Sequence, residues 1–199
     1  MDDSLYEEDQ SPERQYSFLK EYFRKDTPQN YYLVDVGPGH GFSNSFSYNF
    51  LEDHSWKGLL IEPSRKYVES LRKLYERSPN ALVINLGVSY TGETQLFYQV
   101  HDSFSFKKRS VDKFIQVDTL PLEDILERAH TPVSFDLLIL NTLDSDSLIF
   151  ENFLKQFKYR PRVVLSRQKC KDNAEYSELH STSTTTIYLY KGVADGTLA

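Results

Sequence analysis

The feature that most constrains the fold is a strand-like run that leads directly into a glycine-rich loop. Residues 31–36 read YYLVDV, an apolar and β-branched run of strand length. The next five residues, GPGHG, place Gly37, Gly39 and Gly41 at alternate positions. Because glycine tolerates backbone conformations that other residues avoid, this alternation predicts a tight turn where side chains would obstruct something that comes close to the backbone.

Strands and helices alternate along the rest of the chain. The runs KGLLIE (57–62) and ALVINL (81–86) read as further strands, and a helix with one apolar face separates them at 66–78. Further strand-like runs stand at 135–142, 162–167 and 184–192. Alternation through short connections indicates a parallel sheet covered by helices, with right-handed crossovers. The predicted fold class is therefore α/β.

The chain length predicts one well-buried domain, because 199 residues are few for two. Residues 1–10 read as a mobile acidic leader, residues 11–192 as a single domain, and residues 193–199 as a frayed tail. Residues around 90–118 carry a turn signal and two strand-like runs that interrupt the alternation. We expect this segment to be an insert that carries substrate-specific structure.

Composition and charge argue against several classes of protein. Apolar residues make up 39% of the chain and aromatic residues 14%, as in a chain that folds. The formal net charge of −6 argues against indiscriminate binding to nucleic acid or to an anionic membrane. The single cysteine, Cys170, cannot form an internal disulfide, and no Cys and His spacing resembles a zinc site, so we expect no metal. Without a secretory pattern or a membrane-length apolar run, the expected location is cytoplasmic.

The glycine spacing distinguishes among nucleotide ligands. A dinucleotide fingerprint needs a third glycine at position 42, which is Phe42, and a P-loop needs a lysine that this loop lacks. The G-x-G-x-G spacing, with Asp35 two positions before it, suits S-adenosylmethionine better, since that ligand has an ammonium group and no phosphate. Glu62, which ends the second strand, is placed to accept hydrogen bonds from both ribose hydroxyls. Glu62 would serve NAD equally well, and the alternative for both carboxylates is a plain strand-end charge.

Several sequence blocks follow one another in a characteristic order. They are VDVGPGHGFSNSF, LLIEPS, VINLGVS with the TGE turn after it, VDTLPLEDIL, FDLLILNTLDSD and RVVLS. Over about residues 30–192, this order resembles the FkbM-type family of class I methyltransferases. The resemblance implies a Rossmann-like fold with a mostly parallel central sheet, helices on both faces and an antiparallel C-terminal strand. Whether the last segment supplies one such strand or two stays open.

The same resemblance implies S-adenosylmethionine as cofactor and a binding site made by the loops after the first three strands. Asp35, Gly37, Gly39 and Gly41 would line the methionine part of the cofactor, and the loop residues Pro38, His40 and Phe42 are included in the predicted site. Glu62 would hold the ribose, and Pro63 and Ser64 would lie near the adenine. Asn85 and Gly87 would lie on the other side of the adenine. For His40 and Phe42, ordinary loop packing is the alternative.

The region after the fourth strand departs from the family pattern. Asn141 replaces the family's strand-end Asp, and Asp144 stands in place of its glycine. Methyl transfer mainly requires alignment of the acceptor in a dry site, but a hydroxyl acceptor also needs a proton sink. Asp144 or Asp146 could act as that general base, and Asn141 could orient the acceptor or the cofactor. The alternative for the two aspartates is capping of the helix expected at 145–157.

Two groups of basic residues bear on the choice of acceptor. One group, in the insert, is Lys107, Lys108, Arg109 and Lys113; the other, around the fifth strand, is Arg160, Arg162, Arg167, Lys169 and Lys171. Solvated basic loops are the ordinary interpretation. The functional interpretation is an anionic acceptor, such as a phosphorylated sugar or a nucleic acid backbone. His180, ahead of the last strand, is a candidate for the border of the acceptor pocket.

Together these patterns predict an S-adenosylmethionine-dependent methyltransferase that acts on a hydroxyl oxygen of a small molecule or sugar. A small-molecule hydroxyl acceptor is the favoured partner, nucleic acid is less favoured, and no membrane partner is expected. The departures after the fourth strand support an alternative, a noncatalytic protein that binds the cofactor or a protein partner. An RNA ribose 2′-O-methyltransferase is a weaker alternative, because we find no convincing Lys-Asp-Lys-Glu set. A nicotinamide-dependent oxidoreductase lacks its third glycine.

Overall fold

A seven-stranded sheet forms the centre of the computed structural model. The structure describes residues 12–25, 30–42, 45–53, 55–100, 103–105, 113–156, 158–171 and 173–192. The sheet contains β1 (Tyr31–Val36), β2 (Trp56–Ile61), β3 (Ala81–Ile84), β9 (Ser134–Leu140), β10 (Arg160–Ser166), β11 (Tyr176–Ser181) and β12 (Thr186–Tyr190). The predicted leader at 1–10, the tail at 193–199 and the basic residues Lys107, Lys108 and Arg109 lie outside the described residues.

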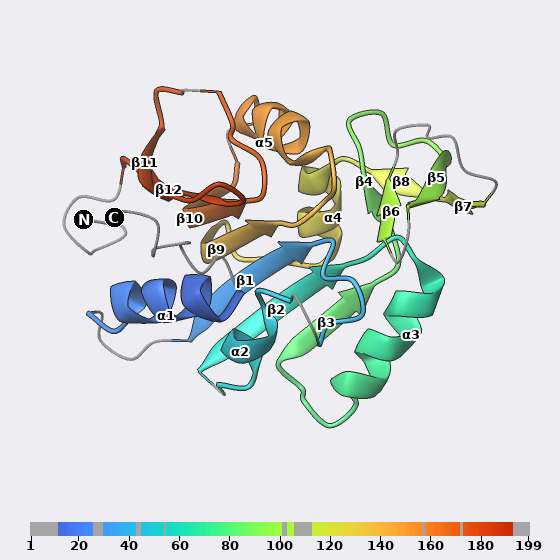
Figure 1. Cartoon of the computed structure of the whole chain (residues 1–199), viewed down its shortest axis with the longest axis horizontal. Helices are drawn as coiled ribbons and strands as arrows, with labels where there is room; N and C mark the ends of the chain where they lie inside the picture. Colours follow the sequence, from blue (N-terminus) through green and yellow to red (C-terminus); the bar gives the residue numbers. More distant parts are fainter. Residues whose placement is uncertain are drawn as a thin grey trace, which may run out of the picture.

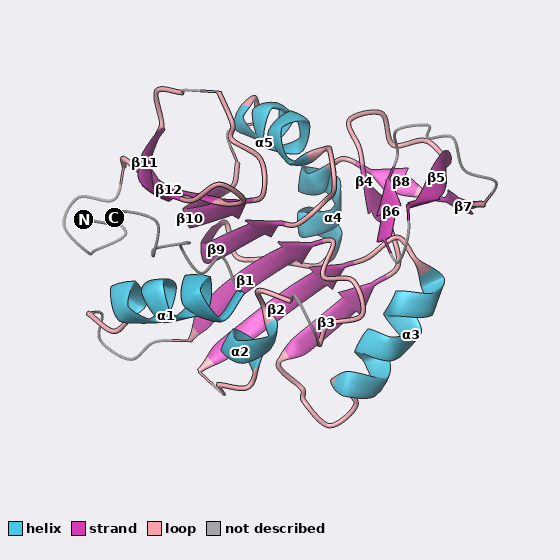
Figure 2. Cartoon of the chain, viewed as in Figure 1, coloured by secondary structure: helices cyan, strands magenta, loops and turns pink. Residues whose placement is uncertain are grey.

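The strands of this sheet follow the order β11-β12-β10-β9-β1-β2-β3. Strands β1, β2, β3, β9 and β10 are parallel, while β12 is antiparallel to β10 and β11 is antiparallel to β12. The helices that cover the sheet are α1 (Pro12–Phe23), α2 (Tyr48–Leu51), α3 (Arg65–Leu74), α4 (Leu122–Arg128) and α5 (Asp146–Leu154). Figure 2 shows these helices around the sheet. The predicted mostly parallel sheet with an antiparallel C-terminal strand is confirmed.

Strand β1 lies near the middle of the sheet and contributes to two hydrophobic cores. Because successive side chains of a strand point to opposite faces, Leu33 packs with residues of α1, α2 and α3, whereas Val34 and Val36 pack with residues of α4 and α5. Figure 1 shows the two groups of helices on opposite sides of the sheet. Both faces of the parallel strands are therefore buried, which explains why these strands are apolar along most of their length.

Helix α3 has several of the sequence features that predict a helix. Ser64 stands at its N-cap, Val68 and Leu71 are buried, and Leu71 packs with residues of the sheet. Arg72 and Lys73 occupy the last turn, where positive charge interacts favourably with the helix dipole.

No helix in the described ranges is both long and apolar enough to cross a membrane.

Two small sheets lie beside the central one, within and directly next to the region predicted to be an insert. Strands β4 (Gly87–Val88) and β8 (Thr119–Leu120) form a parallel pair, and β5 (Gln95–Val100), β6 (Ser103–Ser105) and β7 (Phe114–Val117) form an antiparallel sheet in the order β6-β5-β7. The second strand-like run of this region, FIQVDT at 114–119, predicts one strand, but the structure divides it at Asp118. The backbone oxygen of Asp118 accepts a hydrogen bond from Gly87, and its carboxylate accepts one from Thr94, so this residue leaves the β7 pairing.

Two elements differ from the pattern expected at the outset. The sequence after the glycine loop, through Leu51, predicts a helix despite its many Ser and Asn residues, but the structure contains only the single turn α2 there. Serine and asparagine are frequent in this segment, and both have low helix propensity. The hydroxyls of Ser45 and Ser47 lie 3.2 Å apart in a hydrogen bond just before α2. The chain end supplies two antiparallel strands, because the polar run 176–181 forms the edge strand β11 beside β12.

Candidate functional site

The predicted cofactor loop lies where the carboxyl ends of three parallel strands meet. Val36 at the end of β1 is paired with Ile61 of β2 and with Leu140 of β9. The loops that follow these strands therefore share one edge of the sheet, which is where ligands bind in open α/β folds. Gly37 and Asn141 extend this pairing beyond the strands, because the backbone N–H of Gly37 donates to Ile61 and that of Asn141 donates to Val36.

The three loop glycines have left-handed backbone conformations but different surroundings. Their φ angles are +84° for Gly37, +64° for Gly39 and +82° for Gly41. A Cβ atom at Gly37 would lie 2.7 Å from the backbone oxygen of Asn141, and one at Gly41 would overlap the Leu71 side chain. Gly39 has nothing within 4 Å of that position. Contacts inside the protein thus account for two of the glycines, and Gly39 is the one that faces open space.

Glu62 joins the glycine loop to the end of β2. Its Oε2 accepts a hydrogen bond from the Gly39 N–H at 3.0 Å, and its Oε1 accepts one from the Ser64 N–H at 2.8 Å. The side chain is only 4% exposed, and this burial raises the pKa of the carboxyl to about 8, despite the two backbone hydrogen bonds that lower it. Glu62 is therefore fixed in orientation, and each of its oxygens keeps acceptor capacity for a further hydroxyl.

Asp35 is fully buried, and neither oxygen of its carboxylate has a hydrogen-bond partner. Burial raises the pKa of this carboxyl to about 7. The Ser47 hydroxyl opposes the shift in part, although its geometry falls short of a hydrogen bond. The Tyr75 hydroxyl of the α3 region is also buried without a partner, and its pKa is raised by burial and then by the charge of Asp35. These groups form an under-satisfied polar cluster at the base of the glycine loop.

The turn between β2 and α3 is held by Asn85. The Asn85 side-chain amide donates to the backbone oxygen of Glu62 at 3.0 Å and to that of Pro63 at 2.9 Å. Ser64 is buried beside Glu62, and Gly87 is buried in β4, where its N–H donates to Asp118. The structure therefore brings Glu62, Pro63, Ser64 and Asn85 together, and it gives Asn85 a positioning role that the sequence did not indicate.

The other predicted residues of the loop lie at its surface or pack within it. Pro38 is buried, whereas His40 is exposed and Phe42 is 67% exposed. The His40 ring meets Tyr67 edge-on at 6.1 Å and its Nδ1 accepts a hydrogen bond from the Phe42 N–H. The Phe42 ring meets Tyr48 at 5.3 Å. These contacts agree with loop packing for the two rings, and their role toward a cofactor stays a prediction.

The three predicted catalytic residues, Asn141, Asp144 and Asp146, follow β9 and have different surroundings. Asn141 Oδ1 accepts a hydrogen bond from Arg167 Nη1 at 3.1 Å, which places a guanidinium next to the glycine loop. Asp144 is half-buried and accepts a hydrogen bond from the Ser145 hydroxyl at 3.1 Å. From the sequence, Arg167 belongs only to the basic residues around the fifth strand, and no sequence feature indicates that it lies beside Asn141.

Asp146 is engaged in structural hydrogen bonds. Asp146 is fully buried in the first turn of α5. Its Oδ1 atom accepts hydrogen bonds from the Thr142 N–H, at 2.8 Å, and from the Thr142 hydroxyl. Its Oδ2 atom accepts hydrogen bonds from the Arg167 N–H, at 2.8 Å, and from the Ser166 hydroxyl. These bonds tie α5 to the ends of β9 and β10. Because the carboxylate is buried and accepts four hydrogen bonds from residues outside α5, the geometry favours a structural role for Asp146. The N-cap residue Ser145 makes no side-chain capping hydrogen bond, and the role of Asp146 as a general base stays a prediction.

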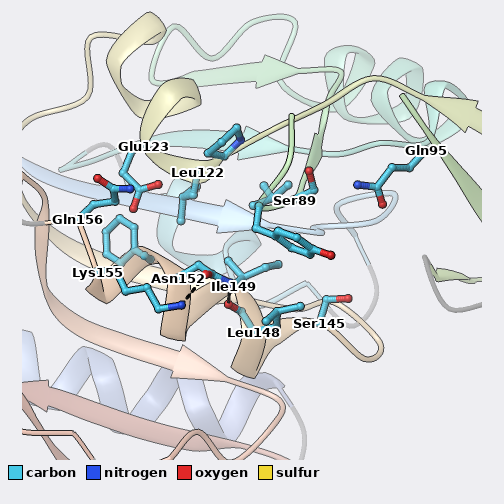
Figure 3. Close-up of a pocket in the computed structure, with 14 residues that line it drawn as sticks. Ser89, Gln95, Leu122, Glu123, Ser145, Leu148, Ile149, Asn152, Lys155 and Gln156 are labelled. Carbon is cyan, nitrogen blue, oxygen red and sulfur yellow. Dashed lines mark hydrogen bonds between the residues drawn. The ribbon is translucent and has the colours of Figure 1, made fainter. Parts of the chain in front are cut away.

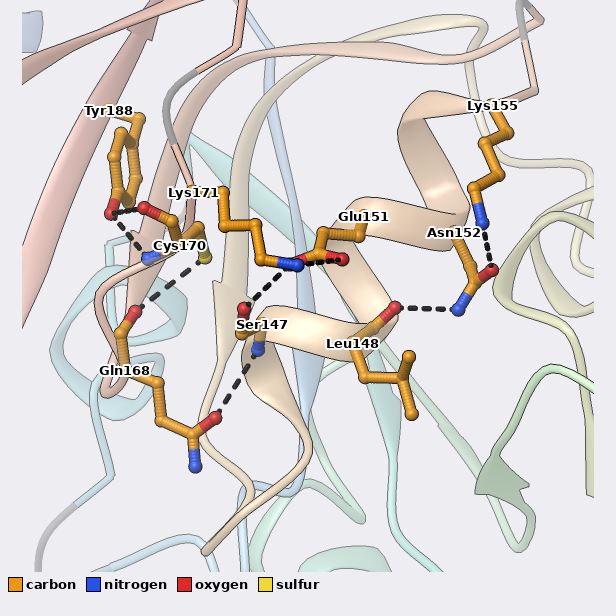
Figure 4. Close-up of polar contacts among 9 residues, drawn as sticks. All are labelled: Ser147, Leu148, Glu151, Asn152, Lys155, Gln168, Cys170, Lys171 and Tyr188. Carbon is orange, nitrogen blue, oxygen red and sulfur yellow. Dashed lines mark hydrogen bonds and ion pairs between the residues drawn. The ribbon is translucent and has the colours of Figure 1, made fainter.

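The basic residues around β10 are mostly engaged with neighbours. Arg160 pairs with Glu175, Lys169 pairs with Glu178 at 3.1 Å, and Lys171 pairs with Glu151 at 3.3 Å. Figure 4 shows the last of these pairs beside the contacts of Gln168 with Ser147 and of Cys170 with Tyr188. Arg162 is buried with its guanidinium over the rings of Tyr22 and Phe23.

His180 lies away from the candidate site. Its ring stacks on Phe18 of α1 at 4.8 Å, and it belongs to the edge strand β11. It therefore does not join the residues at the ends of β1, β2 and β9. Within the described part of the chain, no group of three His, Cys, Asp or Glu residues is arranged to hold a metal ion.

Comparison with known proteins identifies the fold. No protein-family model matches the sequence, and no curated protein matches it. Among solved structures, a putative methyltransferase, yhhF, from Escherichia coli superposes with a TM-score of 0.55 at 10% identity, over 90% of this chain and 87% of that chain. The chain has the Rossmann-like fold of these methyltransferases.

Two further solved structures agree. The METTL16 methyltransferase domain gives a TM-score of 0.55 at 13% identity, over 90% of this chain and 67% of that chain. An FkbM methyltransferase from Methylobacillus flagellatus gives a TM-score of 0.52 at 14% identity, over 85% of this chain and 46% of that chain. Such identities demonstrate a shared fold, and membership of the FkbM family stays a prediction.

Proposed function

We propose that the protein is an S-adenosylmethionine-dependent methyltransferase that methylates a hydroxyl oxygen of a small molecule or sugar. The observation that carries this proposal is the pair of unpartnered Asp35 oxygens, buried at the base of a loop in which Gly39 faces open space. A buried carboxylate without partners is costly, so it favours a cationic ligand group beside it. The ammonium group of S-adenosylmethionine supplies such a group.

The residues around the loop fit the rest of that cofactor. Glu62 is held by Gly39 and Ser64 with acceptor capacity to spare for the two ribose hydroxyls. Asn85 fixes the turn that carries Glu62, and the absence of a side chain at Gly39 leaves room for a ligand against the backbone. When bound, S-adenosylmethionine supplies a methyl group on a positively charged sulfur.

The chain's own contribution to transfer is proton handling and orientation. Transfer to a hydroxyl releases a proton, and the half-buried Asp144 is the carboxylate of the 141–146 segment that remains suited to accept it. Asn141 and Arg167 form a hydrogen-bonded pair beside the glycine loop, where they can orient the acceptor. Asp146 holds the segment in place through its bonds to Thr142 and Arg167.

A second candidate function is a noncatalytic protein that retains the cofactor site. It is favoured by the engagement of Asn141 with Arg167 and of Asp146 with its four donors, which leave one carboxylate for chemistry. A nucleic acid acceptor is less favoured, because Arg160, Lys169 and Lys171 are paired with carboxylates.

Thermal unfolding with three ligands tests the proposal. S-adenosylmethionine and its demethylated product should each raise the melting temperature, and NAD should not. A ligand present at about 100 times its dissociation constant adds about 2.7 kcal/mol, which corresponds to a rise of roughly 5–10 °C for a chain of this size. A rise with NAD alone, or with none of the three ligands, would contradict the proposal.

A further inference from the structure

A pocket lies between α4 and α5, on the face of the sheet opposite α3 (Figure 3). Its volume is about 190 Å³. Its apolar lining includes residues of β4, α4 and α5, namely Val88, Leu122, Leu148, Ile149 and Phe153. Apolar pockets with a few polar groups are the usual sites for small molecules.

Polar groups stand at both ends of the pocket, and Asn152 lies between them. Figure 3 shows Glu123 and Gln156 at one end and Ser145 and Gln95 at the other. The Oε1 atom of Glu123 is buried and has no hydrogen-bond partner. Burial is the largest effect on the pKa of this carboxyl and raises it, the Glu123 backbone N–H lowers it in part, and the nearby charges of Asp124 and Arg160 have smaller effects that raise and lower it, respectively.

The cations near this end of the pocket are bonded elsewhere. Lys155 lines the pocket, but its Nζ donates to Asn152 Oδ1 at 3.0 Å (Figure 3). Arg160 pairs with Glu175. The unpartnered oxygen of Glu123 is therefore a position for a donor that the described residues do not supply.

The other end of the pocket adjoins the residues proposed for transfer. Ser145 lines the pocket, and its hydroxyl donates to Asp144 at 3.1 Å. Four residues earlier, Asn141 donates its N–H to the end of β1, directly before the glycine loop. The short segment 141–145 thus connects the candidate cofactor loop to the pocket.

We infer that this pocket binds the methyl acceptor, a small molecule with an apolar body and an ammonium group that pairs with Glu123. The inference rests on the proposed function, because an acceptor exists only if the protein transfers a methyl group. The acceptor hydroxyl lies at the Ser145 end, near Asp144, and the apolar body contacts Leu122, Leu148 and Ile149.

Amide NMR of the full isotope-labelled chain tests this inference with two probes, tyramine and para-ethylphenol, which differ by the ammonium group. Tyramine should shift the amides of residues 121–123 and 145–153. Glu123→Gln should weaken tyramine binding by about tenfold and leave para-ethylphenol unchanged, as expected for the loss of one charge-assisted hydrogen bond. Glu127→Gln, an exposed position of the same helix, is the matched control and should have no effect on either probe.

A second pair of variants tests the apolar part without disturbing the core. Leu148 is 49% exposed and lines the pocket, whereas Leu82 on β3 is 47% exposed and does not. Leu148→Trp should abolish the binding of both probes, and Leu82→Trp should retain it. Shifts confined to other regions, or equal tyramine affinity in wild type and Glu123→Gln, would overturn the inference.

The same samples separate this inference from the proposed function. S-adenosylhomocysteine, titrated alone, reports on residues 37–42 and 62–64. Cofactor binding without any response of the pocket to tyramine would overturn the acceptor assignment and leave the proposed function standing. A pocket response without cofactor binding would overturn both, because the pocket would then bind amines for another purpose.

Discussion

The backbone N–H of Gly39 donates a hydrogen bond of 3.0 Å to Oε2 of Glu62. This bond joins the loop after β1 to the end of β2, and Asn85 holds the same end of β2 through two further bonds. The loop and the carboxylate that we assign to the cofactor therefore form one connected unit. We therefore expect a substitution of Gly39 or Glu62 to change ligand affinity more than the free energy of unfolding.

Substitution of Gly39 by alanine separates these two effects. The left-handed backbone of Gly39 should make Gly39→Ala cost about 1 kcal/mol of stability, and the new methyl group should enter the open space and weaken S-adenosylmethionine binding at least about tenfold. Gly92 is the matched control, because its φ is +70° and its Cβ position has ordinary contacts. Gly92→Ala should cost similar stability and leave affinity intact. Equal affinities of the two variants, measured by titration, would disprove the assignment of Gly39.

Substitution of Gly37, in contrast, should mainly reduce the stability of the protein. A methyl group there would lie 2.7 Å from the Asn141 backbone oxygen, and neither backbone can move without disturbing the sheet. We expect Gly37→Ala to lower the free energy of unfolding by roughly 2–4 kcal/mol in urea denaturation, clearly more than Gly92→Ala. If the two variants were equally stable, internal packing would not explain this glycine.

The raised pKa of Asp35 predicts how stability depends on pH. Because burial raises this pKa from 3.8 to about 7, the folded state holds a proton that the unfolded state has lost between those values. The stabilisation is complete below pH 3.8 and is lost as the pH rises through about 7. Asp35→Asn should therefore stabilise the ligand-free protein at pH 8, by on the order of 2 kcal/mol, and flatten the decline.

Chemical denaturation of the wild type, Asp35→Asn and the surface control Asp124→Asn at pH 5 and pH 8 measures this effect. Glu62, whose pKa is raised from 4.5 to about 8, adds a decline of the same sign between these two values, which remains in Asp35→Asn. A wild type that gains stability from pH 5 to pH 8 while Asp35→Asn does not would show that Asp35 is charged and partnered in the folded protein.

The two aspartates of the 141–146 segment should differ in their contribution to stability. Asp146→Asn replaces one carboxylate oxygen with an NH₂ donor, so it breaks either the bonds from Thr142 or those from Ser166 and Arg167, and it should cost about 2–3 kcal/mol. Asp144→Asn should stay within about 0.5 kcal/mol of wild type, because Asp144 is only half-buried. Thermal melts of both variants measure the difference. A larger loss of stability for Asp144→Asn would indicate that Asp144 is the structural residue and Asp146 the catalytic candidate.

The fold was largely predictable because the strands of the parallel sheet are apolar on both faces and separated by recognisable turns. The run YYLVDV coincides with β1, residue for residue. Strand β11 was harder to recognise, since an edge strand of polar residues such as Ser177 and Glu178 lacks an apolar pattern. The helix expected up to Leu51 is only the single turn α2, because the many Ser and Asn residues of that segment have low helix propensity.

The candidate site was predictable only in part, because a residue type does not reveal its partners. The sequence indicated that Asp35 and Glu62 end neighbouring strands, but it could not tell that Glu62 is held by two N–H groups while Asp35 has no partner. It also could not separate Asp144 from Asp146, which differ only in their burial and donors. The Glu123 pocket depends on the packing of α4 against α5, which no local pattern reports.

Calorimetric titration of the purified protein with S-adenosylmethionine and with S-adenosylhomocysteine, repeated on Asp35→Ala and Glu62→Ala, tests the cofactor assignment most directly. We predict micromolar binding of both ligands to the wild type and loss of binding in both variants, with circular dichroism showing that the variants remain folded. Absence of binding heat in the wild type, or unchanged affinity in both folded variants, would contradict this assignment.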